Sequence, residues 1–335
     1  MITYIKILID SPEFLAQLII NGLLVGAIFA LIAYGLALIW GVMDIINFAQ
    51  GEMVIFGGYI TYTLFYQFGI HPILTIPIVA VLLYVFGLLI YKTVIYRLLG
   101  EKDIFITILA TFGLAILMQQ LMQAIFGPDV VTANPELGMQ FLFDGALIIS
   151  NIQLVSFIIA VFVAIVLFVV MKYSRLGQTI RATAQNPRAA RILGINIDKV
   201  YANTFAINAA LCGIGGSLVV MIWTIHPFIG LVYTFRSFFI VILAGLGNFM
   251  GIIFTGMGIS AFENVTGFII GAEFQAFTNA HVIEWHFEGT AHELGRWSNL
   301  RKDRPQIEFD AFEQRALGGQ CDLPRLMHLL EEHAL

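Results

Sequence analysis

The sequence predicts an all-α, polytopic membrane bundle of about seven or eight spans. Of its 335 residues, 59% are hydrophobic and only 12% are charged, whereas soluble domains carry about 25% charged residues. Several uncharged windows are longer than the ~20 residues that a helix needs to cross a bilayer. They include 14–43, 104–126, 146–171 and 237–262. The composition therefore indicates an integral membrane protein.

The apolar runs give the expected spans in chain order. We expect them at about 14–40, 48–68, 74–96, 104–126, 146–171, 202–224 and 237–260. Pro72 and Pro77 divide the long run from 53 to 91 into two of these. A shorter apolar stretch at about 265–277, interrupted by Glu273, would be an eighth span.

The basic residues predict how the bundle is oriented. One link between spans, 172–200, is rich in bases and holds a single acid, Asp198. Its bases are Lys172, Arg175, Arg181, Arg188, Arg191 and Lys199. The link at 127–145 has three acids and no base. The positive-inside rule places 172–200 in the cytoplasm and 127–145 outside, and by alternation the N-terminus also lies outside.

The 172–200 link has the pattern of a docking element. Asn186 can cap a helix and Pro187 suits its first position, while Gly194 provides a left-handed stop. These signals predict a helix of about two turns, roughly 10 Å long. A second, amphipathic helix is expected before it, because apolar residues recur four apart. These are Leu176, Ile180 and Ala184.

Small side chains in this loop would let it enter a groove on a soluble partner. The residues expected at the docking surface are Arg181, Ala182, Ala184, Gln185, Asn186, Pro187, Arg188, Ala189, Ala190, Leu193 and Gly194. The alternative is a solvated basic loop that only fixes the topology. Topology requires charges, however, and not a capped helix with a glycine stop.

Glycines are frequent in the first and last clear spans, and two explanations stay open. Small residues permit close helix packing in lipid, or they mark broken backbone that lines a path. Polar interruptions at 41–52 and 244–251 favour the second explanation, since paired interruptions are a pointer to duplicated transporters. The candidates for the path are Asp44, Asn47, Gln50, Gly51, Glu52, Gly245, Gly247 and Asn248.

Polar residues within the predicted spans are similarly open to two interpretations. Asp44 and Glu52 are functional candidates if they lie at membrane depth, but a carboxylate costs little at the cytoplasmic interface. Other polar positions could face a path or form hydrogen bonds between helices, and the second use is favoured. These are Asn21, Thr111, Gln119, Gln120 and Gln123.

Three parts of the sequence resemble one family, the permeases of branched-chain amino acid ABC transporters (the LivH-like group). They are the loop 181–196, the segment 34–52, and 244–251 with the following Gly256. The matches keep the family's order over roughly 12–277. The resemblance implies a multi-pass protein of the bacterial inner membrane. It also implies that Arg181 to Gly194 form the coupling helix that docks on an ATPase.

The same resemblance implies the partners and the source of energy. The family's permease works with a second, similar permease, two cytoplasmic ATP-binding subunits and a periplasmic solute-binding protein. The chain has no G-x-x-x-x-G-K-[ST] phosphate loop, so ATP would be bound by partners and no cofactor is expected in this chain. Membrane lipid is expected around the spans, and no nucleic-acid partner. The alternatives are an ATP-independent channel or secondary carrier for a small polar solute, or a permease for urea or amides.

The chain departs from the family after residue 277. Residues 279–335 hold ten acids, six bases and five of the seven histidines, so a polar soluble tail is expected at 278–335. A frameshift or replaced gene end is the first explanation, and an appended domain is the second. Its histidines lack His-x-x-x-His spacing, so no metal site is predicted. Cys212 and Cys321 predict no disulfide.

Overall fold

Helices make up most of the described chain. The computed structural model describes residues 11–99, 104–142, 147–245 and 247–270. They belong to the unit Met1–His281, whereas a second unit, Val282–Leu335, lies outside the described residues. The predicted tail at 278–335, with its histidines and Cys321, therefore also lies outside them.

The elements follow one another with a single hairpin among the described residues. The bounds are α2 (Pro12–Met43), α3 (Gln50–Phe68), α4 (Pro72–Ile90), the π-helix η1 (Tyr91–Ile95), α5 (Tyr96–Leu98), α6 (Ile104–Phe126), β1 (Met139–Leu142), β2 (Leu147–Ser150), α7 (Asn151–Tyr173), α8 (Arg175–Gln185), α9 (Pro187–Ile192), α10 (Ile197–Ile222), α11 (Gly230–Ala244) and α12 (Phe249–Ile270). The two strands pair antiparallel, with Met139 opposite Ser150.

Six helical stretches of the described chain are long and apolar enough to cross a membrane. They are Pro12–Met43, Pro72–Leu98, Phe105–Phe126, Asn151–Tyr173, Ile197–Ile222 and Phe249–Ile269. Of two further helices, α3 packs against α10, the shorter apolar α11 packs against α2, and the two pack against each other. The chain is thus the all-α polytopic bundle that the sequence predicts.

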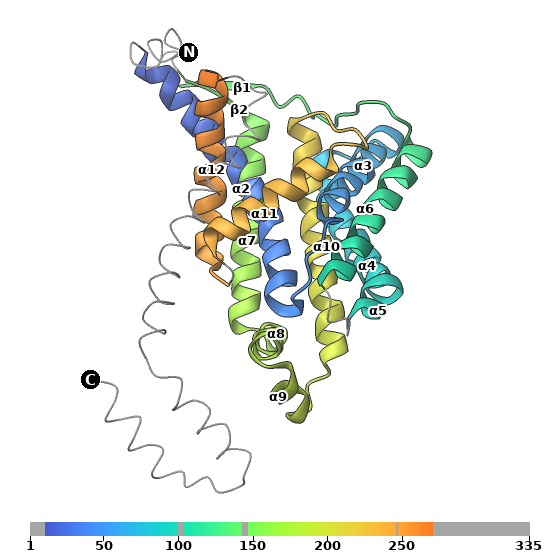
Figure 1. Ribbon diagram of the computed structural model, residues 1–335. Coiled ribbons are helices and arrows are strands. Elements are labelled where there is room, and N and C mark those ends of the chain that lie inside the picture. The colour runs from blue at the N-terminus through green and yellow to red at the C-terminus, as the bar shows by residue number, and fades with distance from the viewer. Residues whose placement is uncertain (1–10, 100–103, 143–146, 246, 271–335) are drawn as a thin grey trace, which may run out of the picture. The chain divides into compact units, whose positions relative to one another are not determined.

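The two ends of this bundle carry different structures. Figure 1 shows the β1–β2 hairpin at one end and α8 with α9 at the other. The hairpin is tied to α2, because the Gln17 amide exchanges hydrogen bonds with the backbone of Ile148. The loop before it is tied to the end of α10 through a backbone bridge between Val131 and Ile225. By the predicted topology the hairpin lies outside and α8 and α9 lie in the cytoplasm.

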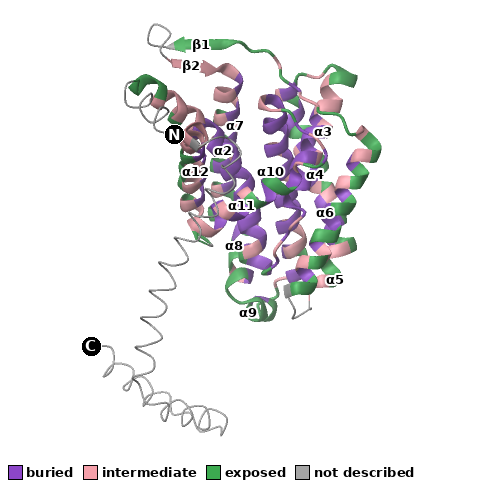
Figure 2. Ribbon diagram, turned by 45° about the horizontal axis from the view of Figure 1, so that its top comes forward, coloured by how far each residue is buried: buried purple, intermediate pink, exposed green. Residues whose placement is uncertain are grey.

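Helix α2 runs through the core, whereas α4, α6 and α7 present apolar faces outward (Figure 2). In the most apolar 18-residue window of α2, 94% of the residues are buried, against 28% in that of α7. A bilayer would cover the exposed apolar side chains of the outer helices. They include Leu82, Val85, Leu109, Leu117, Ile158 and Phe162.

Two predicted boundaries were wrong. The predicted span 237–260 is not one helix, since α11 ends at Ala244 and α12 begins at Phe249. The start of the predicted span 146–171 is a strand, and helix α7 begins only at Asn151. In both places an uncharged run conceals a change of backbone direction. The apolar stretch predicted at 265–277 continues α12 as far as Ile270, and the rest lies outside the described residues.

Packing explains several of the glycines. A methyl group on Gly26 would lie 2.6 Å from the Met257 Cα, and one on Gly57 would lie 2.6 Å from the Gly213 Cα. These glycines therefore let α2 approach α12, and α3 approach α10, at backbone distance. Two other glycines have positive φ instead: Gly245, which caps the end of α11, at +80°, and Gly247, in the link to α12, at +85°.

Two long helices are each followed by a non-helical stretch and a helix that starts inside the bundle. Helix α2 leads through 44–49 to α3, and α10 leads through 223–229 to α11. The two long helices run in opposite directions, since α2 begins beside the hairpin and α10 begins after α9 (Figure 1). This opposed arrangement is typical of the inverted repeats of transporters.

Candidate functional site

Local hydrogen bonds build the cytoplasmic helix pair α8–α9. Ser174 caps α8 by accepting from the Gly177 N–H at 3.0 Å, and Asn186 caps α9 by accepting from the Ala189 N–H at 3.0 Å. Gly194 follows α9 with φ of +82°. The helix start at Asn186-Pro187 and the left-handed stop at Gly194 that the sequence predicts are therefore both confirmed.

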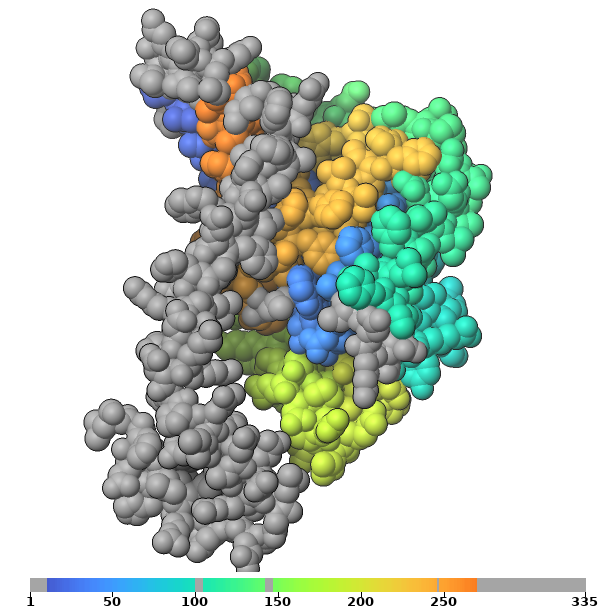
Figure 3. Space-filling model, viewed as in Figure 1, coloured from blue at the N-terminus to red at the C-terminus, as the bar shows by residue number. Residues whose placement is uncertain are grey.

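The exposed side of the pair carries apolar and basic side chains together. Ile192 and Leu193 are 86% and 79% exposed, and Arg188 and Arg191 beside them are also exposed. Figure 3 shows the pair on the surface at one end of the described bundle. Ile192 was missed by the sequence reasoning, although its place just before Leu193 at the end of the predicted helix could have indicated it.

The predicted docking residues divide into exposed and buried ones. The exposed ones are Arg181, Ala184, Gln185, Asn186, Pro187, Arg188, Ala189, Leu193 and Gly194. Ala182 is half-buried and Ala190 is 2% exposed, so Ala190 packs inside the protein and not at a docking surface. The predicted apolar face of α8 was also partly wrong, because Ala184 is exposed while Gly177, Ile180 and Thr183 are buried.

Arg181 has an internal partner. Its guanidinium donates to the carbonyls of Met171 and Lys172 at the end of α7. Cationic side chains at a helix C-terminus satisfy its last carbonyls. Arg181 thus holds α8 against α7, which leaves Arg188 and Arg191 as the basic side chains at the tip.

A hollow separates α9 from the bundle. It has a volume of about 530 Å³ and includes side chains of α2, α9 and α10. Met43, Asp198 and Tyr201 line it from the bundle, and Arg188, Arg191 and Ile192 of α9 line it from the other side. The α8–α9 pair therefore contacts the bundle mainly through α8 and through the ends of its linkers.

Inside the bundle, polar groups meet where α3, α10 and α11 come together. We define the buried junction as Gln50, Gly51, Glu52, Asn208, Gly230 and Thr234. All six are buried. Three of them, Gln50, Gly51 and Glu52, are residues that the sequence predicts for a path.

Hydrogen bonds between distant segments hold the buried junction. Gln50 donates to the Ile32 carbonyl at 3.1 Å and accepts from the Asn208 amide at 2.9 Å. The Gly51 N–H donates to the Thr234 hydroxyl at 2.8 Å. These contacts join α3 to α2, α10 and α11 at one level of the bundle.

The first turn of α3 also meets the N-terminus of α11. Space there admits no side chain on either glycine: a methyl group on Gly51 would overlap the Gly230 carbonyl, and one on Gly230 would overlap the Glu52 carboxylate. The N-terminus of a helix carries partial positive charge and favours a carboxylate. Asn208, Gly230 and Thr234 were missed because single polar or small residues in an apolar run look like ordinary packing positions.

The other predicted path residues lie elsewhere. Asp44 is exposed at the end of α2 with φ of +53°, while Asn47 is buried and accepts from the Ala49 N–H. Gly245, Gly247 and Asn248 are exposed in the link between α11 and α12. The structure therefore places 44–52 and 245–248 in different surroundings. Among the described residues, no group of His, Cys, Asp and Glu is arranged to hold a metal ion.

Sequence similarity identifies the kind of protein that carries these features. The family of the branched-chain amino acid transport system permease component matches residues 18–285. The chain belongs to this family. The match takes in the whole described bundle from α2 to α12 except the first residues of α2.

Curated relatives agree with this family. The chain is 26% identical over 285 residues to the high-affinity branched-chain amino acid transport system permease protein LivH of Salmonella typhimurium, covering 79% of this chain and 91% of the relative. The LivH of Escherichia coli K12 gives the same identity and coverage. The permease protein BraD of Pseudomonas aeruginosa is 29% identical over 272 residues, covering 77% and 88%. No solved structure matches the chain.

These relatives settle the general class of this family member. They are transport permeases and not enzymes. Together with the six membrane-length helices, they make the chain a multi-pass inner-membrane protein. The family resemblance that the sequence predicts is thereby confirmed.

Proposed function

We propose that the chain is the permease subunit of an ABC importer that carries branched-chain or related small amino acids across the bacterial inner membrane. In this proposal two cytoplasmic ATP-binding subunits supply the energy and ATP is bound only by them. A second, homologous permease completes the membrane part. A periplasmic solute-binding protein delivers the amino acid to the outer face.

The observation that carries the proposal is the exposed tip of the α8–α9 pair. Exposure of Ile192 and Leu193 to water is unfavourable unless a partner covers them. Exposed apolar patches of this kind mark interaction sites. Arg188 and Arg191 would pair with acidic groups around a groove on the ATPase subunit that receives the tip. Helix-in-groove docking needs this combination of apolar anchors and a polar rim.

Movement of this tip can reach the interior of the bundle. Helix α8 packs on α7 and α10 and on α2, and α2 and α10 both bond to the buried junction through Ile32 and Asn208. ATP hydrolysis would be coupled to rocking of the helices if the contacts of the tip with the ATPase subunits differ in free energy between the inward-open and outward-open states. The non-helical stretches 44–49 and 245–248, which contain predicted path residues, interrupt the helices, so they are places where such rocking can be absorbed.

One observation favours the alternative of an ion-driven carrier. Such a carrier should have charged pairs deep among its spans, and Arg236 of α11 pairs with Glu263 of α12. The carrier requires no docking tip, however, and a purified carrier would transport without ATPase subunits. A urea or amide permease would keep the ATPases and differ in its solute.

Replacing Gly194 by Val tests the proposed docking. The left-handed φ of +82° disfavours a β-branched residue, and no neighbouring atom lies within 4 Å of an added Cβ, so the strain falls on the turn alone. We expect the ATPase subunits to be lost on purification of the complex, and amino-acid uptake by proteoliposomes to fall at least about tenfold.

Two further variants make the test specific. Gly113→Val is the matched control, because Gly113 also has open space around it but lies within α6 at a negative φ. Ile192→Asp removes the apolar anchor without touching the core, since Ile192 is 86% exposed. Normal uptake and normal ATPase recovery in both Gly194→Val and Ile192→Asp would contradict the proposal.

A further inference from the structure

A polar pocket lies between helices α2, α7, α11 and α12, near the end of the bundle that carries the hairpin. We call it the outer pocket and define it by its lining: Leu18, Asn21, Val25, Gln153, Trp223, Arg236, Ser260 and Asn264. Its volume is about 400 Å³, which lies within the range of small-molecule sites. By the predicted topology it lies in the outer half of the membrane region.

Three buried polar atoms of this lining have no hydrogen-bond partner in the protein. They are the Asn21 Oδ1, the Arg236 Nε and the Ser260 Oγ. Ser260 as a whole is only 2% exposed. A buried polar atom without a partner costs about 1–3 kcal/mol. Three such atoms around one cavity are groups to which a molecule bound in that cavity can form hydrogen bonds.

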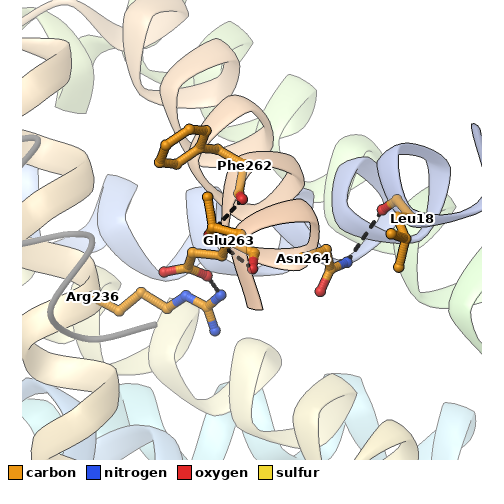
Figure 4. Close-up of polar contacts among 6 residues, drawn as sticks. Leu18, Arg236, Phe262, Glu263 and Asn264 are labelled. Atoms are coloured by element: carbon orange, nitrogen blue, oxygen red, sulfur yellow. Dashed lines mark hydrogen bonds and ion pairs between the residues drawn. The ribbon is translucent and has the colours of Figure 1, made fainter. Parts of the chain in front are cut away.

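Arg236 is held in place from two sides. One terminal nitrogen of its guanidinium pairs with the Glu263 carboxylate, as Figure 4 shows. The guanidinium carbon lies 3.7 Å from the centroid of the Phe29 ring, so the group stacks on that ring. The Phe29 ring also contacts the rings of Trp223 and Tyr233, at centroid distances of 5.8 and 5.9 Å.

This clamp leaves part of the guanidinium for a ligand. A guanidinium has five N–H donors in one plane, and the Nε–H has no partner while the Arg236 side chain is 23% exposed. Glu263 is 5% exposed and is absent from the lining. Glu263 thus orients Arg236 and balances its charge, and Arg236 itself lines the cavity.

We propose that the outer pocket binds the transported solute as a zwitterionic aliphatic α-amino acid, with its carboxylate on Arg236 and its ammonium group between Asn21 and Ser260. This proposal rests on the proposed function and names the site within it. Leu18, Val25 and Trp223 provide the apolar surface for the aliphatic side chain. Glu263 and Phe29 act as positioning residues.

The chemistry of the lining favours this class of ligand over other small solutes. Arg236 supplies the planar donor edge that fits a carboxylate, whereas urea has no anionic group. The unpaired acceptor atoms on the facing helices α2 and α12 suit an ammonium group, which only donates. A simple anion would use Arg236 and leave the Asn21 oxygen unbonded.

Binding of leucine to the purified complex of permease and ATPase subunits, without the solute-binding protein, tests the outer pocket directly. We expect millimolar L-leucine to raise the thermal midpoint of the complex. Leucinol, which lacks the carboxylate, and 4-methylpentanoate, which lacks the ammonium group, should raise it much less. The double variant Arg236→Met/Glu263→Met should lose the response to leucine, because it removes the guanidinium without leaving a lone buried charge.

Uptake by proteoliposomes that contain the complete transporter gives the second measurement. The double variant should assemble and hydrolyse ATP, yet its kcat/KM for leucine uptake should fall at least about tenfold, as loss of a charged hydrogen bond implies. Arg236→Lys should assemble and raise the KM several-fold, because a lysine lacks the forked donor edge.

The outcomes separate this proposal from the proposed function. A double variant that binds and transports leucine as the wild type does would show that the ion pair only packs the helices, and the pocket proposal would fall while the importer stands. If the purified wild-type protein neither took up leucine nor retained ATPase subunits, the proposed function would be wrong. Even then, equal thermal responses to leucine and leucinol would overturn the pocket, and an Arg236-dependent response to leucine would support it.

Discussion

The buried junction and the outer pocket both gather polar side chains inside the bundle, but they differ in the space around them. At the junction, Gln50 and Asn208 bond each other at 2.9 Å, and Gly51 has no room for a methyl group against Gly230. In the outer pocket, Ser260 and Arg236 keep unbonded atoms beside a cavity of about 400 Å³. The junction also holds one unbonded atom, the Glu52 Oε2, but its other polar groups are bonded and closely packed. The unbonded groups of the outer pocket surround a cavity, so they are available to a ligand.

The most damaging change should be Gly51→Ala at the buried junction. The added Cβ would overlap the Gly230 carbonyl, and overpacking of a rigid contact costs up to about 3 kcal/mol. The denaturation midpoint of the solubilised chain should fall strongly. Gly41→Ala is the matched control in α2, since nothing lies within 4 Å of a Cβ there. Equal midpoints in the two variants would refute the tight packing at the junction.

Asn208→Ala should have the next largest effect on stability. It leaves the Gln50 oxygen buried and without its donor, which costs about 1–2 kcal/mol. A double-mutant cycle with Gln50→Ala checks the pair itself. Its coupling should be about 0.6 kcal/mol, the average for side-chain hydrogen bonds between membrane helices. Strict additivity would show that the two side chains act independently.

Phe29→Leu should affect the outer pocket more than the fold. The change removes the ring under the Arg236 guanidinium, a contact worth about 0.5–2 kcal/mol. We expect the KM for leucine uptake to rise several-fold, because Arg236 loses its fixed position. Phe56→Leu serves as the comparison: it breaks the ring pair with Phe86 at 5.0 Å, outside the pocket. Equal changes of KM in both variants would argue against a specific role of Phe29.

Ser260→Ala should have the smallest effect on stability and still lower leucine binding. The hydroxyl is buried and has no protein partner, so its removal breaks no hydrogen bond and should not lower the unfolding free energy. Ser217→Ala should do the reverse, because the Ser217 hydroxyl bonds Thr61 at 2.7 Å and the Gly213 carbonyl at 2.9 Å. Both variants are compared by thermal midpoint and by the response to leucine. If both changed only the thermal midpoint, the contrast between the outer pocket and a bonded, packed site would be contradicted.

The sequence determined those features that depend on neighbouring residues. The first predicted span, 14–40, became Pro12–Met43, because a long uncharged run has no other stable state in a bilayer. The turn from α8 to α9 was predicted correctly because Asn186 caps a donor only three residues further on. Charges within short links also predict the orientation of the bundle.

Tertiary structure decided which distant segments meet. Gly51 bonds Thr234, 183 positions away, and neither residue type distinguishes that contact from ordinary packing. Arg236 and Glu263 bound the uncharged window 237–262 in the sequence, where they look like the two ends of one span. On a single helix they would lie about 40 Å apart at 1.5 Å per residue. The break between α11 and α12, with Gly245 and Gly247 at positive φ, folds the chain back so that the two charges meet inside the bundle.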